Sequence, residues 1–253
     1  MEKIEKSRRT FALILFLTLV VCTVYSLVKF ILAPDEIPEN GVPDKLKSDY
    51  LLMLVQCCLG IFVMTIPGII SRRFRLMIPG VMCILYYIFL YCAIILGEIL
   101  SFYHLFPGVW DSLLHAMSAA MLATLGFILV DWLNKEEGVR FSINPFFVAL
   151  FAFSFAVMVG TLWEIYEFCV DGALKLNMQH YAAPDATPYL GRAAVIDTMK
   201  DIIIDVIASL VVALIGLATY LKRKRTVDRE TLEPSAGAEE QEKAPTAIGV
   251  RDQ

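Results

Sequence analysis

Six stretches of the chain are almost continuously apolar and are separated by shorter polar segments. An α-helix needs about 20 apolar residues to cross roughly 30 Å of hydrocarbon, and each stretch meets that length. They comprise residues 11–32, 50–70, 77–100, 109–132, 145–170 and 196–221. The pattern predicts an all-α, polytopic membrane bundle of six transmembrane helices.

The composition supports a membrane location. Of the 253 residues, 58% are hydrophobic and 19% are charged, whereas soluble domains are about 45–50% apolar. The first stretch follows Arg8 and Arg9 like a secretory signal, but it exceeds the roughly 7–15 apolar residues of a signal and no small-residue cleavage site follows it. We therefore expect a retained helix. The lipid bilayer is the expected partner, and no nucleic acid is expected.

Basic residues alternate between the two sides of the predicted bundle. Short loops rich in Lys and Arg stay on the cytoplasmic side. The basic segments are residues 3–9, 72–75, 135–140 and 222–225. Both termini are therefore expected in the cytoplasm, with the protein in the cell (inner) membrane. The expected organisation is a short basic lead over 1–10, a membrane domain over 11–221 and a disordered cytoplasmic tail over 222–253.

The last three stretches carry small residues at four-residue spacing. Small side chains on one helix face allow neighbouring backbones to approach closely. The residues are Ala119 and Ala123, then Ala152, Ala156 and Gly160, then Ser209 and Ala213. The spacing predicts a compact functional core over about 109–216. The alternative is that small residues are simply common in membrane helices.

The same three stretches contain most of the acidic residues that lie inside apolar segments. A charge inside hydrocarbon costs at least ~2.5 kcal/mol even on the most forgiving scale, so these residues need compensation. At a rise of about 1.5 Å per residue, His115, Glu164 and Asp201 fall at one depth. Asp205 lies about one turn deeper. The residues nearer the water are Asp111, Glu167, Asp197 and Asp171.

The spacing also places these residues on shared helix faces. Positions i, i+3, i+4 and i+7 cluster on one side of a helix. Carboxylates that converge need a cation or shared protons, and we expect no Lys or Arg among them at that depth. The expected ligands of a divalent cation (Mg²⁺, Mn²⁺, Ca²⁺ or Zn²⁺) are His115, Glu164, Glu167, Asp201 and Asp205, with Asp111, Asp197 and Asp171 as secondary candidates.

Each of these residues also has a simpler interpretation. Asp111, Asp171 and Asp197 lie near helix ends, where acids are ordinary. The deeper acids can form a hydrogen-bonded network without chemistry, and His115 can be a hydrogen-bonded core histidine. Three further polar residues are expected to be solvated: Glu98, His104 and His180. The six cysteines show no CxxC pairing and are expected to be small buried hydrophobes.

Three segments resemble a known family. They are DSLLHAMSAAMLATLG from Asp111, WEIYEFCVD from Trp163 and IDTMKDIIIDVIASLVVALIG from Ile196. Together they resemble the bacterial YjdF-like inner-membrane family, which is similar in general plan to VanZ-like membrane proteins. The resemblance covers about 109–216. It implies a small multi-pass membrane protein and the importance of Asp111, His115, Glu164, Glu167, Asp197 and Asp201, without naming a reaction.

Three functions fit these observations. The first is binding or transport of a divalent cation or protons. The second is a metal-dependent membrane hydrolase or transferase that acts on a lipid-linked substrate, with Glu164 or Asp201 as general base. The third is an accessory or assembly protein. The sequence lacks HExxH, GxSxG and a Gly-rich phosphate loop, and cation or proton handling is therefore placed first.

Overall fold

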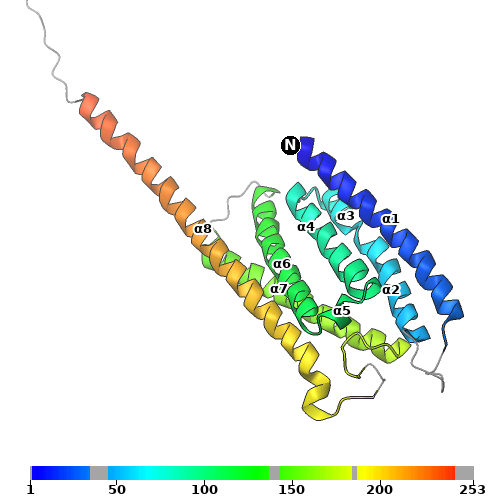
Figure 1. The fold of residues 1–253 in the computed structure, drawn as a ribbon. Coiled ribbons are helices and arrows are strands. Elements are labelled where there is room, and N and C mark those ends of the chain that lie inside the picture. Colours follow the sequence, from blue (N-terminus) through cyan, green and yellow to red (C-terminus); the bar gives the residue numbers. More distant parts are fainter. Residues whose placement is uncertain (1, 35–44, 137–142, 184–186, 243–253) are drawn as a thin grey trace, which may run out of the picture.

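The fold is a bundle of long helices, seen in a computed structural model that describes residues 2–34, 45–136, 143–183 and 187–242 (Figure 1). Its elements in chain order are α1 (Glu2–Leu32), α2 (Lys47–Val63), α3 (Ile66–Phe74), α4 (Gly80–Leu90), the π-helix η1 (Tyr91–Ile99), α5 (Phe102–Leu105), α6 (Val109–Glu136), α7 (Pro145–Leu174), the 3₁₀ helix η2 (Gly191–Val195) and α8 (Ile196–Glu242).

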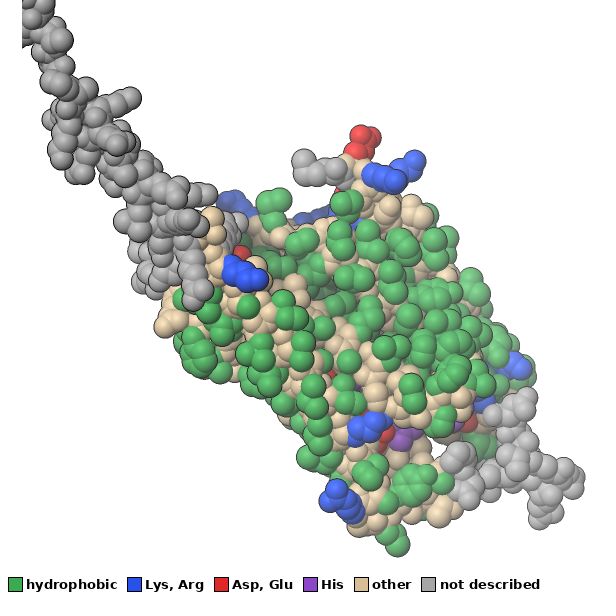
Figure 2. Space-filling model, turned by 60° about the vertical axis from the view of Figure 1, so that its left-hand side comes forward, with side chains coloured by type: hydrophobic (Ala, Val, Ile, Leu, Met, Phe, Trp, Pro, Cys, Tyr) green, Lys and Arg blue, Asp and Glu red, His purple; other side chains and the backbone are tan. Residues whose placement is uncertain are grey.

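The described residues contain six helical segments that are long and apolar enough to cross a membrane, which confirms the predicted all-α bundle. Two of them are composite, because α2 continues into α3 and α4 continues into η1. Apolar side chains cover the middle of the face shown in Figure 2, and most Lys and Arg lie toward the two ends of the molecule. This distribution suits a bilayer around the bundle.

The first and the last helix extend furthest beyond the apolar stretches. α1 begins at Glu2 rather than near residue 11, and Glu5 Oε1 accepts hydrogen bonds from Arg8 and Arg9 at 2.6 and 3.1 Å. Such pairs stabilise a helical turn that apolar periodicity does not detect. α8 runs on to Glu242, so residues 222–242 of the expected tail are helical. Residues 243–253 lie outside the described part of the chain.

The helices form two groups. α1 packs on α2 and α4, while α6, α7 and α8 pack on one another (Figure 1). The small residues predicted to bring the second group together are buried, with Ala123, Ala152 and Ala156 fully so. A Cβ on Gly126 would lie only 2.7 Å from Cα of Ala152. α6 and α7 therefore make backbone contact here, as the small-residue spacing predicts.

The six cysteines are all free, as expected. Cys22, Cys57 and Cys83 are buried in the first helix group, where they pack as small hydrophobic residues. The expectation of burial is wrong for Cys58 and Cys169, which are exposed on the outer faces of α2 and α7. In a bilayer these outer faces contact lipid tails, which accept a weakly polar thiol as readily as the core does.

The third span ends in the π-helix η1, whose side chains point in other directions than a continued α-helix would give them. Leu100 donates its backbone N–H to Ile95 at 2.9 Å, a five-residue step, and Ser101 has a φ of 60°. π-Helical turns are rare and occur often at functional sites. The following short helix α5 then folds back, because Gly97 has no side chain: a Cβ there would lie 2.5 Å from the ring of Tyr103. Tyr103 thus lies against η1 near Glu98.

Candidate functional site

His115 stands at the meeting point of α6, α7 and α8. Its Nδ1 lies 3.3 Å from Oδ1 of Asp205, and its Nε2 lies 3.8 Å from Oε1 of Glu164 and 3.9 Å from Oδ1 of Asp111. Asp201 completes the group, since one of its oxygens lies within 4.8 Å of ligand atoms of both Asp111 and His115. We call these five residues the histidine–carboxylate cluster.

Most of this cluster is shielded from solvent. Asp201 and Asp205 are each 2% exposed, Glu164 is 4% and His115 is 8% exposed. Among the described residues, four of its buried oxygens have no hydrogen-bond partner: both oxygens of Glu164, Oδ1 of Asp201 and Oδ2 of Asp205. Buried polar atoms are nearly always paired, and an unpaired one costs about 1–3 kcal/mol. The cluster therefore has unused capacity for a cation or for protons.

The arrangement depends on the close contact between α7 and α8. A Cβ on Gly160 would overlap the Asp205 carboxylate, whose Oδ2 would be its nearest neighbour. Ser209, which is fully buried, donates its hydroxyl to the backbone oxygen of Asp205 at 2.6 Å. Because Gly160 presents no side chain, the Asp205 carboxylate rests against the α7 backbone and faces His115.

The donor set suits a divalent cation. Asp111, His115 and Asp201 each offer one ligand atom, and these atoms lie within 4.8 Å of one another. Carboxylate oxygens are the ligands of Mg²⁺, Ca²⁺ and Mn²⁺, and imidazole extends the choice to Zn²⁺. Three protein ligands leave positions open for water or another ligand. Asp205 Oδ1 accepts from Nδ1 of His115, the type of contact that orients a metal-binding histidine through its other ring nitrogen.

The nearest basic side chain on α8 does not neutralise this cluster. Lys200 precedes Asp201 in the chain, but its Nζ donates to the backbone oxygen of Gly108 at 2.6 Å in an exposed position. A step of one residue turns a helix by about 100°, which separates the two side chains. The expectation that no Lys or Arg lies inside the spans at this depth is wrong, because Lys200 lies within the sixth stretch beside Asp201, although its Nζ bonds to Gly108 instead of to the acids.

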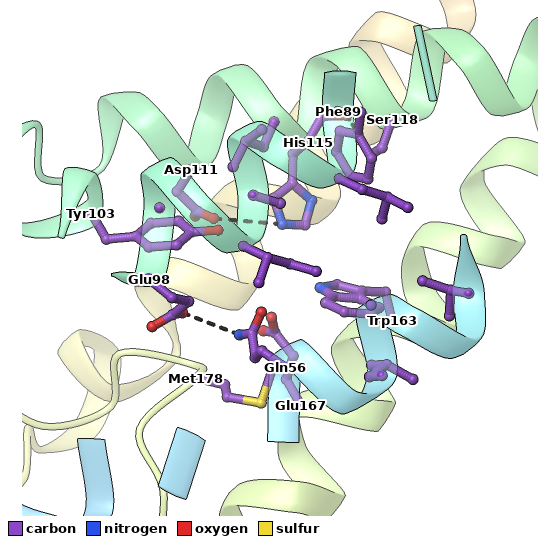
Figure 3. A pocket seen from close by; sticks show the side chains of 18 of the residues that line it. Gln56, Phe89, Glu98, Tyr103, Asp111, His115, Ser118, Trp163, Glu167 and Met178 are labelled. Carbon is purple, nitrogen blue, oxygen red and sulfur yellow. Dashed lines mark hydrogen bonds and ion pairs between the residues drawn. The ribbon is translucent and has the colours of Figure 1, made fainter. Parts of the chain in front are cut away.

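Three of the predicted ligands lie outside the cluster. Asp171 accepts the backbone N–H groups of Met178 and Gln179 at 2.9 and 3.0 Å, so its carboxylate anchors the segment that follows α7. Asp197 lies 2.9 Å from Nδ1 of His180. Glu167 lines a cavity beside the cluster (Figure 3). The simple interpretation of Asp171 as a helix-end residue is the one that its contacts fit.

The sequence predicts solvated side chains for Glu98 and His180, whereas the structure pairs both. Glu98 accepts from Nε2 of Gln56 at 3.1 Å (Figure 3), and its backbone oxygen lies 3.2 Å from Nζ of Lys45. Burial lowers the pKa of Lys45. Burial, reinforced by Glu98 and Asp111, raises the pKa of Tyr103 far above its usual value. The π-helix and the folded-back segments bring these residues to the wall of a cavity that part of the cluster also lines. Apolar periodicity predicts neither the π-helix nor the fold of these segments.

A large cavity lies between the two helix groups and reaches the cluster. Its volume is about 1140 Å³, and Asp111, His115 and Asp205 form part of its wall. Figure 3 shows Glu98, Tyr103, Trp163 and Glu167 around the same space. Ligand pockets are commonly about 300–1,000 Å³, so this cavity has room for more than a bare ion.

The contact between His180 and Asp197 predicts a pH-dependent anchor for the segment after α7. Burial opposes a charge on His180, but the hydrogen bond to Asp197 and the charges of Asp197, Asp111 and Glu98 raise its pKa to about 9. A raised pKa stabilises the folded segment below the unfolded value of about 6.5. That stabilisation is lost as the pH rises through about 9. Hydrogen exchange of residues 176–183, corrected for intrinsic rates, is expected to be slower at pH 6 than at pH 10.

The variant His180→Gln is the control for this prediction. Glutamine keeps a hydrogen-bonding side chain but does not titrate, so its exchange is expected to be the same at both pH values. Equal protection of the wild-type segment at pH 6 and pH 10 contradicts the prediction.

The sequence pattern of one family, described as predicted membrane protein (DUF2238), matches residues 11–223. The chain belongs to this family, which is the YjdF-like family that the three motifs resemble. The similarity to VanZ-like proteins stays a prediction. No curated protein and no solved structure matches the chain.

Proposed function

We propose that this DUF2238 family member binds a divalent cation at the histidine–carboxylate cluster. One observation carries the proposal: four buried carboxylate oxygens around His115 have no hydrogen-bond partner in the described part of the chain. Proteins retain buried acidic side chains when a cation or a proton offsets their negative charge. A divalent cation would be held by Asp111, His115 and Asp201, with Asp205 orienting the imidazole.

The position of the site near one end of the bundle supports exchange of a cation with the outer side of a cell membrane. Figure 1 places the start of α1 and the turn from α3 to α4 at one end of the bundle, and α5 at the other. The first end carries Arg8, Arg9, Arg72 and Arg73, and short basic segments stay in the cytoplasm. The cluster lies in the first turns of α6 and α8, at the opposite end. A cation would then enter from outside.

Two activities follow from such a site, and both use the same residues. In transport, the graded depth from Asp111 to Asp205 provides successive positions for a cation or proton. In catalysis, a bound metal would supply an activated water, and Glu164 or Asp201 would accept a proton from it. Catalysis is kept as the alternative because the cavity next to the cluster has room for a lipid-linked substrate.

Binding of Mn²⁺ to the protein in lipid nanodiscs tests the proposal. One Mn²⁺ per chain is expected, with a pulsed electron paramagnetic resonance signal from a coordinating imidazole nitrogen. His115→Gln is expected to remove that nitrogen signal and weaken binding at least about tenfold. The matched control is His104→Gln, since His104 lines the cavity but is not one of the grouped metal ligands.

Two further outcomes separate the functions. If wild-type protein binds none of Mn²⁺, Mg²⁺, Ca²⁺ and Zn²⁺, the proposal is wrong and the cluster serves helix packing in an accessory protein. If it binds metal, sealed vesicles distinguish the activities. Metal- or pH-driven flux supports transport, and turnover of reconstituted lipid phosphates supports the hydrolase.

A further inference from the structure

The large cavity changes in chemistry along its length. Near the cluster its wall is polar and includes Lys45, Glu98 and His180. Farther along the helices the wall is apolar, with Leu122 and Leu125 from α6, Phe155 and Val159 from α7 and Ile66 and Ile70 from α3. The stretch of α6 from Asp111 to Leu125 is roughly 20 Å long at 1.5 Å per residue. The cavity therefore has the form of an amphiphile with a polar head and a long apolar tail.

One side of this cavity borders the bilayer. α2 and α7 both line the cavity, yet they are not among the extensively packed helix pairs. Trp163 on α7 lines the cavity and is 39% exposed. A molecule that enters between α2 and α7 therefore comes from the surrounding lipid, whose tails match the apolar wall.

A cation bound at the cluster would favour a phosphate headgroup at the polar end of the cavity. A cation held by three protein ligands has open positions, and Mg²⁺-type sites commonly fill such positions with phosphate oxygens. Lys45 and His180 line the wall of this cavity together with the acidic residues Glu98 and Glu167. Lys45 Nζ donates to the backbone oxygen of Glu98, and His180 contacts Asp197, so the bound cation would supply most of the positive charge that a phosphate meets.

We propose that the cavity binds a glycerophospholipid of the surrounding bilayer, with its phosphate on the cation of the histidine–carboxylate cluster and an acyl chain between α2 and α7. The inference rests on the proposed cation site, and it names the class of molecule that the site recognises. The headgroup is held by the metal, Lys45 and His180, and the chain by Leu122, Phe155 and Val159.

Lipid titration of the full chain in mild detergent tests this inference. The probes are fluorescent phosphatidylglycerol and a diacylglycerol with the same chains, each with Mn²⁺ and with a chelator. Phosphatidylglycerol is expected to bind at least about tenfold more tightly with Mn²⁺ than with the chelator, whereas diacylglycerol shows no metal dependence. Lys45→Gln is expected to weaken phosphatidylglycerol alone. The control is Lys29→Gln, because Lys29 does not line the cavity.

A pair of tryptophan substitutions tests the position of the acyl chain. Val159→Trp fills the middle of the cavity and is expected to weaken both probes at least about tenfold, while Mn²⁺ affinity stays unchanged. Met158→Trp is the matched control, because Met158 is the neighbouring residue, is 52% exposed and lies outside the cavity wall. It is expected to bind both probes like the wild type.

The outcomes separate this inference from the proposed function. If Mn²⁺ binds but phosphatidylglycerol binding is independent of Mn²⁺ or unaffected by Val159→Trp, the lipid inference is wrong and the cation site stands. If Mn²⁺ does not bind to the wild-type protein, the proposed function and this headgroup assignment both fail. Tighter binding of a lipid amine without metal also overturns the phosphate assignment, since it means that the carboxylates bind the headgroup directly.

Discussion

Mn²⁺ is expected to raise the thermal stability of the wild-type protein and to leave Asp201→Asn almost unchanged. A ligand that binds only the folded state stabilises it by about 2.7 kcal/mol at a concentration 100 times its dissociation constant. Asp201 is 2% exposed, its Oδ1 has no hydrogen-bond partner among the described residues, and it belongs to the grouped ligands. Replacing this carboxylate therefore removes most of the metal-dependent stabilisation.

With Mn²⁺ the wild type is expected to be the more stable protein. In chelator Asp201→Asn is expected to be more stable than the wild type by about 1 kcal/mol. Four carboxylates and a single histidine form the cluster, so removing one negative charge relieves repulsion between like charges. An amide also brings donors to oxygens that lack partners. Thermal unfolding in one detergent, with Mn²⁺ and with chelator, measures both effects.

Asp171→Asn provides the contrasting control. The Asp171 carboxylate accepts two backbone N–H groups, and its replacement is expected to lower stability with and without metal while preserving the Mn²⁺-dependent increase. If Asp201→Asn shows the same Mn²⁺-dependent increase as the wild type, the metal binds elsewhere. If it is less stable than the wild type in chelator, the carboxylate serves the fold.

Gly160→Ala is expected to weaken Mn²⁺ binding about 10- to 100-fold, although residue 160 is not a metal ligand. The added Cβ would overlap Oδ2 of Asp205, so the carboxylate must move away from α7. Its Oδ1 is the partner of His115 Nδ1 at 3.3 Å. Moving Asp205 therefore releases the imidazole from the orientation that directs Nε2 toward Asp111 and Glu164. Isothermal titration with Mn²⁺ measures the loss.

Gly126→Ala is the matched control for this substitution. Its Cβ would lie 2.7 Å from Cα of Ala152, at the contact between α6 and α7 that the small residues create. Overpacking there is expected to cost about 1–3 kcal/mol of stability without changing the affinity for Mn²⁺. A similar loss of affinity in both variants would mean that general loosening of the helices, and not Asp205, controls the site.

Helix geometry was enough to predict much of the cluster. A rise of about 1.5 Å and a turn of about 100° per residue place His115, Glu164 and Asp201 at one depth and on inward faces, and the structure brings them together. The same geometry accounts for Asp111 and His115, which lie one turn apart on α6. Within a regular helix, spacing along the chain converts directly into position in space.

The prediction failed where a regular helix ends. Asp171 is at the correct spacing from Glu164, but the segment after α7 folds back and occupies its carboxylate. Asp197 pairs with His180 from that same segment. Glu98 enters the cavity wall from a π-helix, in which side chains no longer follow a 100° step. These contacts depend on how non-helical segments fold, which apolar periodicity does not encode.

The sequence by itself determined the six spans, the close packing of the last three helices and the inward direction of His115, Glu164, Asp201 and Asp205, because these properties follow from hydrophobicity and helical repeat. Only the tertiary structure decided which acids have no hydrogen-bond partner, that Gly160 lets Asp205 meet His115, and that a large cavity separates the two helix groups. These features arise between segments distant in sequence, where side-chain shape and loop folding, and not local periodicity, set the distances.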